Sequence, residues 1–429
     1  MISNSKQRLF EMMNRVGGMP LSEENNSLPT LPSWASSSVK YFVPLEDYEE
    51  QVPCATNVQE VERDLNPKAA EIEDPIKWMQ DKDAAIAARK KQDVEHGGRL
   101  SPVMMGNVRK GVDADTLRLP KDADFSKIDY DLEELARILT VVPSPKQILG
   151  QNGKMGKTNF YNVTLPAYRG IFYDISKKKF YVINVCDKAD TCAKVCFAQM
   201  GNFVQHDPVV RLNAQKLNYL LNHAETWKGR VIAGINALYD GVSNVVVRWH
   251  DSGDFFSEEY MKLAFEVAKE TGFAEHYAYT KEVGTAKNLE SMKPENFEFK
   301  FSFGGTQDDL IDKTKDAHAV IVPKNYFGDL QPDEEKFNKK TKKSYIGKGW
   351  NFSDDEFVTL KQRLAGLKKD KGWEGYGIDV NTILTNEELK HIPYKKTNPR
   401  RWNVIGVSGD SDVSALRRDV LGVYLLQHK

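Results

Sequence analysis

The segment VVVRWHDSGDFFSEEYMKLAFEVAKETG, residues 245–272, decides the fold because it joins a strand to a helix through a polar turn. Residues 245–250 are apolar and largely β-branched, as in a strand buried on both faces. Ser257 is placed to cap the following helix and Gly272 to end it. The apolar stripe of that helix is Met261, Ala264, Phe265 and Ala268. The segment therefore predicts a strand–helix unit of an α/β protein.

Strand and helix patterns continue to alternate as far as residue 325. HYAYTK (276–281), FEFKFSFGG (297–305) and AVIVP (319–323) have strand patterns, with helices predicted between them, TQDDLIDKTK (306–315) among these. WNVIGVSGDSD (402–412) predicts one more strand and turn, and SALRRDVLGVYLLQ (414–427) a closing helix. The alternatives are a βα barrel, complete or irregular, and an open sheet. A TIM-like barrel is favoured because polar residues follow successive strands, where barrel active sites lie.

The chain divides into an irregular N-terminal extension and a catalytic domain. Residues 1–130 are rich in Pro, Ser and isolated charges, with one helix predicted from Asp74 to Gly97. Residues 131–429 are expected to form the βα barrel. This domain carries a hairpin (166–185), a cysteine loop (186–206) and a lysine-rich insertion on the barrel rim (about 326–400).

Composition indicates a cytoplasmic protein. The 429 residues include 60 basic and 61 acidic side chains, so an anionic partner has to be held by local patches. No stretch reaches the roughly 18 apolar residues of a membrane span, and the N-terminus has no signal-peptide core. Three of the four cysteines lie within eleven residues, which in a reducing compartment favours metal binding over disulfides.

The cysteine loop is a candidate metal centre. Cys186, Cys192 and Cys196 have the spacing Cys-x5-Cys-x3-Cys and polar flanks. Three thiolates this close suit zinc or an iron–sulfur cluster, although the Cys-x3-Cys-x2-Cys spacing of radical enzymes is absent. A zinc site requires a fourth ligand, and the sequence leaves three candidates open: His206, His223 and His250.

The turn after strand 245–250 is the candidate reacting centre. His250, Asp251 and Asp254 emerge together at a strand end, and two carboxylates with an imidazole are costly to bury unless paired or used. One carboxylate can attack a carbon electrophile while another group handles the proton; the pair can also bind a metal. A role as helix cap is the structural alternative. Residues expected to bind substrate at this and neighbouring strand ends are Ser252, Gly253, Lys281, Gly304 and Gly305.

Two basic segments are candidate nucleic-acid contacts, with a solvated charge run as the alternative for each. KFNKKTKKSYIGKGW (336–350) interleaves lysines with aromatic residues, and NPRRW (398–402) is the second segment. The side chains singled out for phosphate contact are Lys339, Lys340, Lys342, Lys343, Arg400 and Arg401.

Three ordered motifs resemble the phage proteins of the gene product 88 family. These are CDKADTCAKVCFAQMGNF (186–203), RWHDSGDFFSEEY (248–260) and AYTK (278–281). The chain is also similar to the phage DpdA enzymes, relatives of tRNA-guanine transglycosylases that exchange guanine in DNA for a 7-deazaguanine base. The cysteine spacing here is wider than in the transglycosylase zinc motif, and the cysteines precede the aspartates.

The second resemblance implies a βα barrel, a zinc held by three cysteines and a histidine, and two aspartates. One aspartate attacks C1′ and the other recognises the base; Asp251 and Asp254 are the candidates here, in either order. The leading hypothesis is a DNA-modifying glycosyltransferase with zinc, DNA and a 7-deazaguanine base as partners. The alternatives are an iron–sulfur radical-type enzyme acting on nucleotides and a zinc-stabilised nucleic-acid-binding protein without catalysis.

Overall fold

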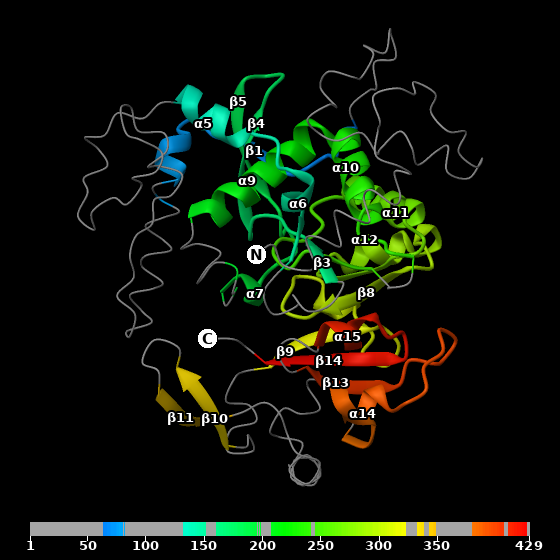
Figure 1. The fold of residues 1–429 in the computed structure, drawn as a ribbon. Coiled ribbons are helices and arrows are strands. Elements are labelled where there is room, and N and C mark those ends of the chain that lie inside the picture. Colours follow the sequence, from blue (N-terminus) through cyan, green and yellow to red (C-terminus); the bar gives the residue numbers. More distant parts are fainter. Residues whose placement is uncertain are drawn as a thin grey trace, which may run out of the picture.

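The computed structural model describes residues 63–79, 81, 132–151, 160–194, 196, 198, 207–241, 245–322, 333–338, 343–348, 380–406 and 411–426. In this part of the chain a nine-stranded sheet has the order β12-β13-β14-β9-β8-β7-β6-β3-β2 (Figure 1). All neighbours pair in parallel except β2 and β3. The strands are β2 (Leu149–Gly150), β3 (Phe160–Val163), β6 (Val246–Trp249), β7 (Glu275–Thr280), β8 (Phe297–Ser302), β9 (His318–Val322), β12 (Ile383–Thr385), β13 (Trp402–Gly406) and β14 (Val420–Leu426).

The helices cover both faces of this sheet. The connections from β3 to β8 run through α9 (Asp207–Asn222), α10 (Ala224–Asn236), α11 (Glu258–Glu270) and α12 (Val283–Asn288). On β7, Ala278 packs into the core shared with α11, whereas its neighbour Tyr277 packs against Ala415 of α15 (Ser411–Leu416). Adjacent strand residues point to opposite faces, so α11 and α15 lie on opposite sides.

These two layers give an open, doubly wound sheet in the described chain, and a closed barrel is not found there. The strands from β3 to β9 follow one another across the sheet, whereas β12, β13 and β14 approach β9 from the far edge. Right-handed crossovers place helices on opposite faces when the direction of winding reverses. The α/β class is confirmed; the face that would be the interior of a barrel is covered by α15.

The C-terminal segment differs from its prediction as a closing helix. Residues 414–427 contain the end of α15 and then β14, which lies between β13 and β9. Val420, Val423 and Tyr424 are fully buried. β-branched and aromatic side chains fit a central strand, and a short apolar run does not distinguish strand from helix by periodicity. Residues 306–315, also predicted as a helix, form only the short 3-10 turn η5 (Asp308–Leu310).

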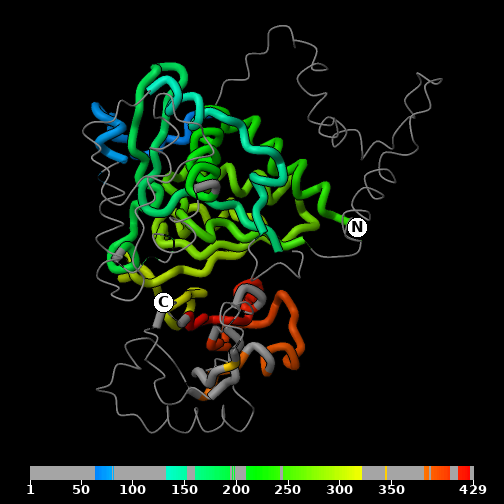
Figure 2. The backbone as a smooth tube through the Cα atoms, turned by 60° about the vertical axis from the view of Figure 1, so that its left-hand side comes forward, coloured from blue at the N-terminus to red at the C-terminus, as the bar shows by residue number. Residues whose placement is uncertain are grey.

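The hairpin is confirmed and belongs to a second, three-stranded sheet. β4 (Arg169–Asp174) pairs with β5 (Lys179–Asn184), which also pairs with β1 (Ala69–Glu71) of the N-terminal region. Figure 2 shows this N-terminal segment, in blue, against the hairpin. The short helix α5 (Leu132–Leu139) and α6 (Pro145–Ile148) precede the large sheet. Part of the extension is therefore integrated into the fold.

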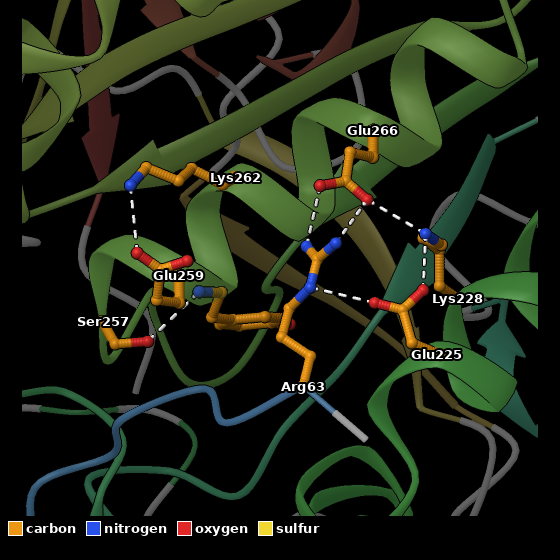
Figure 3. Close-up of polar contacts among 8 residues, drawn as sticks. Arg63, Glu225, Lys228, Ser257, Glu259, Lys262 and Glu266 are labelled. Atoms are coloured by element: carbon orange, nitrogen blue, oxygen red, sulfur yellow. Dashed lines mark hydrogen bonds and ion pairs between the residues drawn. The ribbon is translucent and has the colours of Figure 1, made fainter. Parts of the chain in front are cut away.

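An ion-pair network fixes the N-terminal segment to two helices (Figure 3). Arg63 donates two hydrogen bonds to Glu266 of α11, at 2.7 and 2.9 Å, and its Nε lies 2.9 Å from Glu225 of α10. Lys228 bridges the same carboxylates at 2.6 and 3.0 Å. Leu65, two residues along the chain, is 2% exposed within the main core. Bidentate geometry and a shared network make these pairs stronger than isolated surface pairs.

The lysine-rich insertion contains a two-stranded hairpin. β10 (Asp333–Asn338) pairs antiparallel with β11 (Lys343–Lys348), with Lys336 opposite Tyr345. The segment 386–390 near its end is α14 (Asn386–Lys390), capped by Thr385.

In the parts of the chain that can be described, no helix combines the length and the apolar character needed to span a membrane.

A buried histidine makes the core sensitive to acid. Trp249 Nε1 donates to His276 Nδ1 at 3.2 Å, and His276 Nε2 lies 2.9 Å from Thr271 Oγ1, which itself donates to the Val267 carbonyl. The imidazole is thus held neutral, and burial lowers the pKa of His276 to about 3 from 6.5. The unfolded chain takes up this proton below pH 6.5 and the folded chain does not. The stability that neutral His276 contributes above pH 6.5 is therefore lost as the pH falls from 6.5 toward 3.

We expect the free energy of unfolding to decrease by about 2–3 kcal/mol from this histidine alone between pH 7 and pH 4.5. Denaturant titrations at the two pH values measure the change. His276→Asn lowers stability at pH 7 but reduces the pH dependence; His391→Asn, at an exposed position, keeps it. An unchanged pH dependence in His276→Asn contradicts the assignment.

Candidate functional site

The turn from His250 to Asp254 is fixed by close packing on the segment that follows β3. His250 has φ 60° and donates its backbone N–H to the Val163 carbonyl at 2.8 Å. Gly253 has φ 85°, and a Cβ there would lie 2.8 Å from Leu165 Cβ. Positive φ and this contact both require glycine. Gly253, predicted to bind substrate, therefore shapes the turn.

Asp251 lies in a polar cluster at the carboxyl ends of β6 and β3. It is half-buried and accepts hydrogen bonds from Thr164 Oγ1 and from Asn162 Nδ2, the latter at 3.0 Å. Asn162 is 2% exposed, and its Oδ1 has no hydrogen-bond partner in the described chain. Only the side-chain nitrogen of Asn162 can donate to the Asp251 carboxylate, and this fixes the orientation of the Asn162 amide group. The carboxylate is thus oriented by two neutral donors while retaining access to solvent.

Lys216 of α9 supplies a cation beside this cluster. The side chain is 5% exposed, and burial lowers the pKa of Lys216 to about 8, partly opposed by the attraction of Asp251. A lysine with a pKa this close to neutrality can both donate and accept a proton. Lys216 was not identified from the sequence. The available signal is a charged residue beside Leu217 and Leu220 on the buried face of a helix.

Asp254 lies in a different environment, on the side of β7. Its carboxylate accepts hydrogen bonds from Thr280 Oγ1 at 2.7 Å, from the Lys281 amide at 2.8 Å and from the Phe255 amide at 2.8 Å. It is 6% exposed, and burial raises the pKa of Asp254 although Lys281 opposes the shift. Asp251 accepts hydrogen bonds from residues at the end of β3, whereas Asp254 accepts one from Thr280 at the end of β7. Asp254 therefore joins β6 to β7.

His250, predicted to be catalytic, points into the aromatic core. Its Nε2 lies 2.9 Å from Tyr260 Oη, and its ring packs edge-on against Phe255 at 4.5 Å. Burial lowers the pKa of His250 to about 3, so the ring is neutral at physiological pH. Ser252 beside it is 4% exposed, and its carbonyl accepts a hydrogen bond from the Leu165 amide at 3.1 Å. This geometry gives His250 a packing role between β6 and α11.

The cysteine loop docks on the end of β8. The amides of Asp190 and Cys192 both donate to the Gly304 carbonyl at 3.1 Å, and the Thr306 amide donates to the Lys188 carbonyl at 2.8 Å. A Cβ on Gly305 would lie 2.7 Å from that Lys188 oxygen. The amides of both glycines already donate to the Asp308 carboxylate, each at 2.9 Å. Gly304 and Gly305 are therefore used for loop docking, and their amides are occupied.

This docking brings the cysteine motif and the aspartate turn close together. Lys281 lies between them: its ammonium donates to Ser302 Oγ at 3.1 Å and lies near the Cys192 thiol. Burial lowers the pKa of Lys281, but the neighbouring Cys192 and Asp254 outweigh this effect and raise the pKa. Burial, reinforced by Asp254, raises the pKa of the Cys186 thiol. Lys281, predicted to contact substrate, is internal to this cluster.

The donor chemistry of the loop suits a metal, although the residues that the structure describes do not form a complete ligand set. Cys186, Cys192 and Cys196 form no disulfide within the described part of the chain. Within the described residues no three His, Cys, Asp or Glu side chains are arranged to hold one ion. Of the candidate fourth ligands, His206 lies outside the described residues. His223 precedes α10, and its ring lies 5.8 Å from the Tyr219 ring in a tilted arrangement. His250 faces Tyr260.

Glu282 is a titratable residue that the sequence analysis missed. It follows Lys281 directly, is 6% exposed, and accepts a hydrogen bond from Thr285 Oγ1 at 3.2 Å. Burial, and then the nearby Asp254 charge, raise the pKa of Glu282 to about 7. The sequence feature that could have identified Glu282 is its position at a predicted strand end, directly after Lys281.

Of the predicted nucleic-acid contacts, Arg400 and Arg401 do not adjoin this cluster. Arg400 and Arg401 precede β13, which places them at the amino edge of the parallel sheet, whereas Asp251 and Asp254 follow β6 at the carboxyl edge. Arg400 is paired with Glu298 at 3.2 Å. Lys343 begins β11. Lys339, Lys340 and Lys342 lie outside the described residues.

Comparison with known proteins gives one family. The family model described as Gene product 88 matches residues 146–374, more than half of the chain. The match includes all three motifs on which the resemblance rested. No curated protein and no solved structure matches the chain.

Proposed function

The chain belongs to the gene product 88 family, and we propose that it is a phage-type DNA-modifying transglycosylase with Asp251 as its nucleophile. The observation that carries this proposal is the cluster of Asp251, Asn162, Thr164 and Lys216 at the carboxyl ends of β3 and β6. Ligands of open α/β sheets bind outside the carboxyl ends of the strands.

The two aspartates differ in what they can do as nucleophiles. A carboxylate that attacks carbon has to be ionised and accessible. Asp251 is half-buried and held by two side chains, whereas Asp254 is almost fully buried and saturated by three donors, with its pKa raised. This contrast favours Asp251 and gives Asp254 a structural role.

The proposed reaction conserves both atoms and protons. Asp251 attacks C1′ of a deoxyguanosine, the bond from C1′ to the base nitrogen breaks, and the Lys216 ammonium protonates the departing guanine. A 7-deazaguanine base then gives a proton to Lys216 and attacks C1′, which releases the carboxylate. The target base has to leave the stack to reach this position. The lowered pKa of Lys216 suits a group that gives and regains a proton near neutral pH.

The experiment that tests this function is nucleoside mass spectrometry. Duplex DNA is incubated with the protein and each of several 7-deazaguanine bases, then digested to nucleosides. We expect a modified deoxyguanosine to appear with one of these bases and released guanine in equal amount. Release of neither product with any base contradicts the proposal. Iron-dependent modification of nucleotides would favour the radical-type alternative.

We further propose that Cys186, Cys192 and Cys196 hold a metal that fixes the cysteine loop. A zinc ion bound there would cross-link the loop beside β8, and no step of the exchange passes through it. The supporting feature is that Cys186 and Cys192 both lie near Lys281, while Cys196 lies near Cys186.

For this metal proposal we expect gently purified protein to contain zinc and Cys192→Ser to lose most of it. Elemental analysis measures the content, and Cys54→Ser, which alters the one cysteine outside the motif, is the matched control. A brown protein containing iron and sulfide would identify an iron–sulfur cluster in place of zinc. Metal-free protein from anaerobic purification would contradict both.

A further inference from the structure

A basic surface at the amino edge of the sheet is separate from the reacting centre. It is formed by the exposed loop 393–401 and the turn after α15, and we call it the amino-edge surface. Its cations and aromatic residues are Lys395, Lys396, Arg400, Arg401, Arg417, Arg418, Tyr394 and Trp402. Three acidic side chains, Glu275, Glu298 and Asp419, neutralise Lys396, Arg400 and Arg417 respectively.

Three cations of this surface have no acidic partner among the described residues: Lys395, Arg401 and Arg418. Lys395 and Arg401 are exposed and Arg418 is half-buried. The Arg401 guanidinium lies 4.7 Å from the centre of the Trp402 ring, which leaves its edges available for hydrogen bonds. Uncompensated positive charge beside aromatic side chains is the chemistry that nucleic-acid phosphates and bases recognise.

The surface is held in place by hydrogen bonds. The amides of Arg401 and Trp402 donate to the Asp419 carbonyl at 2.8 and 2.9 Å. The Arg418 amide donates to Tyr394 Oη at 3.3 Å, and Arg417 donates to the carbonyls of Leu389 and Ile392. The loop is therefore preorganised, which lowers the entropic cost of binding a partner.

We propose that the amino-edge surface binds the phosphate backbone of duplex DNA through Lys395, Arg401 and Arg418. This extends the proposed function, because it places a DNA contact away from the reacting base. Five strand spacings separate β13 from β6, and with strand length the surface lies about 30 Å from Asp251. A duplex rising about 3.4 Å per base pair covers that distance in about nine base pairs. The surface would thus anchor DNA nearly one helical turn from the target.

The test is fluorescence anisotropy of a labelled duplex of about 25 base pairs over a series of salt concentrations. Each lost phosphate contact lowers the slope of log affinity against log salt by about 0.9. We expect Lys395→Gln/Arg401→Gln/Arg418→Gln to lower the slope by about 2–3 and to bind at least tenfold more weakly at low salt. Lys146→Gln/Lys178→Gln/Lys179→Gln, which removes equal charge from α6 and the β4–β5 hairpin, should bind like the wild type.

Failure of this inference is distinguishable from failure of the proposed function, because binding is measured without a 7-deazaguanine base. A lowered slope supports the surface even if no base exchange is detected. An unchanged slope overturns it even if exchange occurs. If the triple variant does not fold, Lys395→Gln alone, on the exposed loop, should lower the slope by about one. Equal weakening by the control variant would mean non-specific attraction and overturn the assignment.

Discussion

Asp251→Asn is expected to abolish base exchange while leaving the protein folded. Asparagine can still accept the hydrogen bond from Thr164, but its amide cannot attack C1′. Loss of a nucleophile lowers the turnover rate by on the order of 10³-fold or more. The measurement is the initial rate of modified deoxyguanosine formation, with far-ultraviolet circular dichroism to verify folding.

A second readout separates a nucleophile from a positioning residue. Wild-type protein quenched with denaturant during turnover should carry covalently attached DNA, detected as a mass increase, and Asp251→Asn should not. Asn162→Ala is the matched control, because it removes one hydrogen bond to the carboxylate but keeps the nucleophile. It should slow the reaction and still form the adduct. An adduct in Asp251→Asn together with its absence in Asp254→Asn would transfer the nucleophile to Asp254.

Asp254→Ala is expected to cause the largest loss of stability. The substitution leaves the Thr280 hydroxyl and the amides of Lys281 and Phe255 without their acceptor, in a buried position. It also removes a carboxylate near the Lys281 ammonium. Removal of one member of such a buried charge cluster lowers the free energy of unfolding by about 3–5 kcal/mol, because the remaining groups stay desolvated and unpaired.

The measurement is the free energy of unfolding from denaturant titration at pH 7. Thr280→Val is the control: it deletes one donor to Asp254 and should cost about 1 kcal/mol. Asp254→Ala as stable as the wild type would show that the carboxylate does not join β6 to β7, and the structural role given to it here would fall. Reduced activity without reduced stability would instead support direct participation of Asp254 in the reaction.

Local chemistry made several parts of the molecule predictable from sequence. Ser257 caps α11 by accepting from the Tyr260 amide, and the apolar stripe of that helix is buried in the core. The hairpin between Arg169 and Asn184, the strands β7, β8, β9 and β13, and the family were also identified correctly. These features depend on hydrogen bonds between near neighbours or on the alternation of side chains within one element.

The roles of single residues were harder to predict, because they depend on what packs against them. His250 and Asp251 are adjacent in sequence, yet the imidazole enters the core beside Tyr260 and the carboxylate faces Asn162. Gly304 and Gly305, which follow β8, were predicted to bind substrate. Their backbone groups instead form hydrogen bonds with the cysteine loop and with Asp308. Asn162, Thr164 and Lys216 were missed, since β3 was not identified as a strand and Lys216 comes from a distant helix.

The sequence by itself determined the α/β class, most strand–helix units and the two motifs that meet beside Lys281. Only the tertiary structure decided how the sheet is wound. That outcome depends on β14, whose apolar residues 420–426 pair with β9 and β13 in the middle of the sheet. Its placement carries α15 across to the face opposite α11 and opens the sheet. A seven-residue apolar run has no periodicity that distinguishes strand from helix, so its partners determine its conformation.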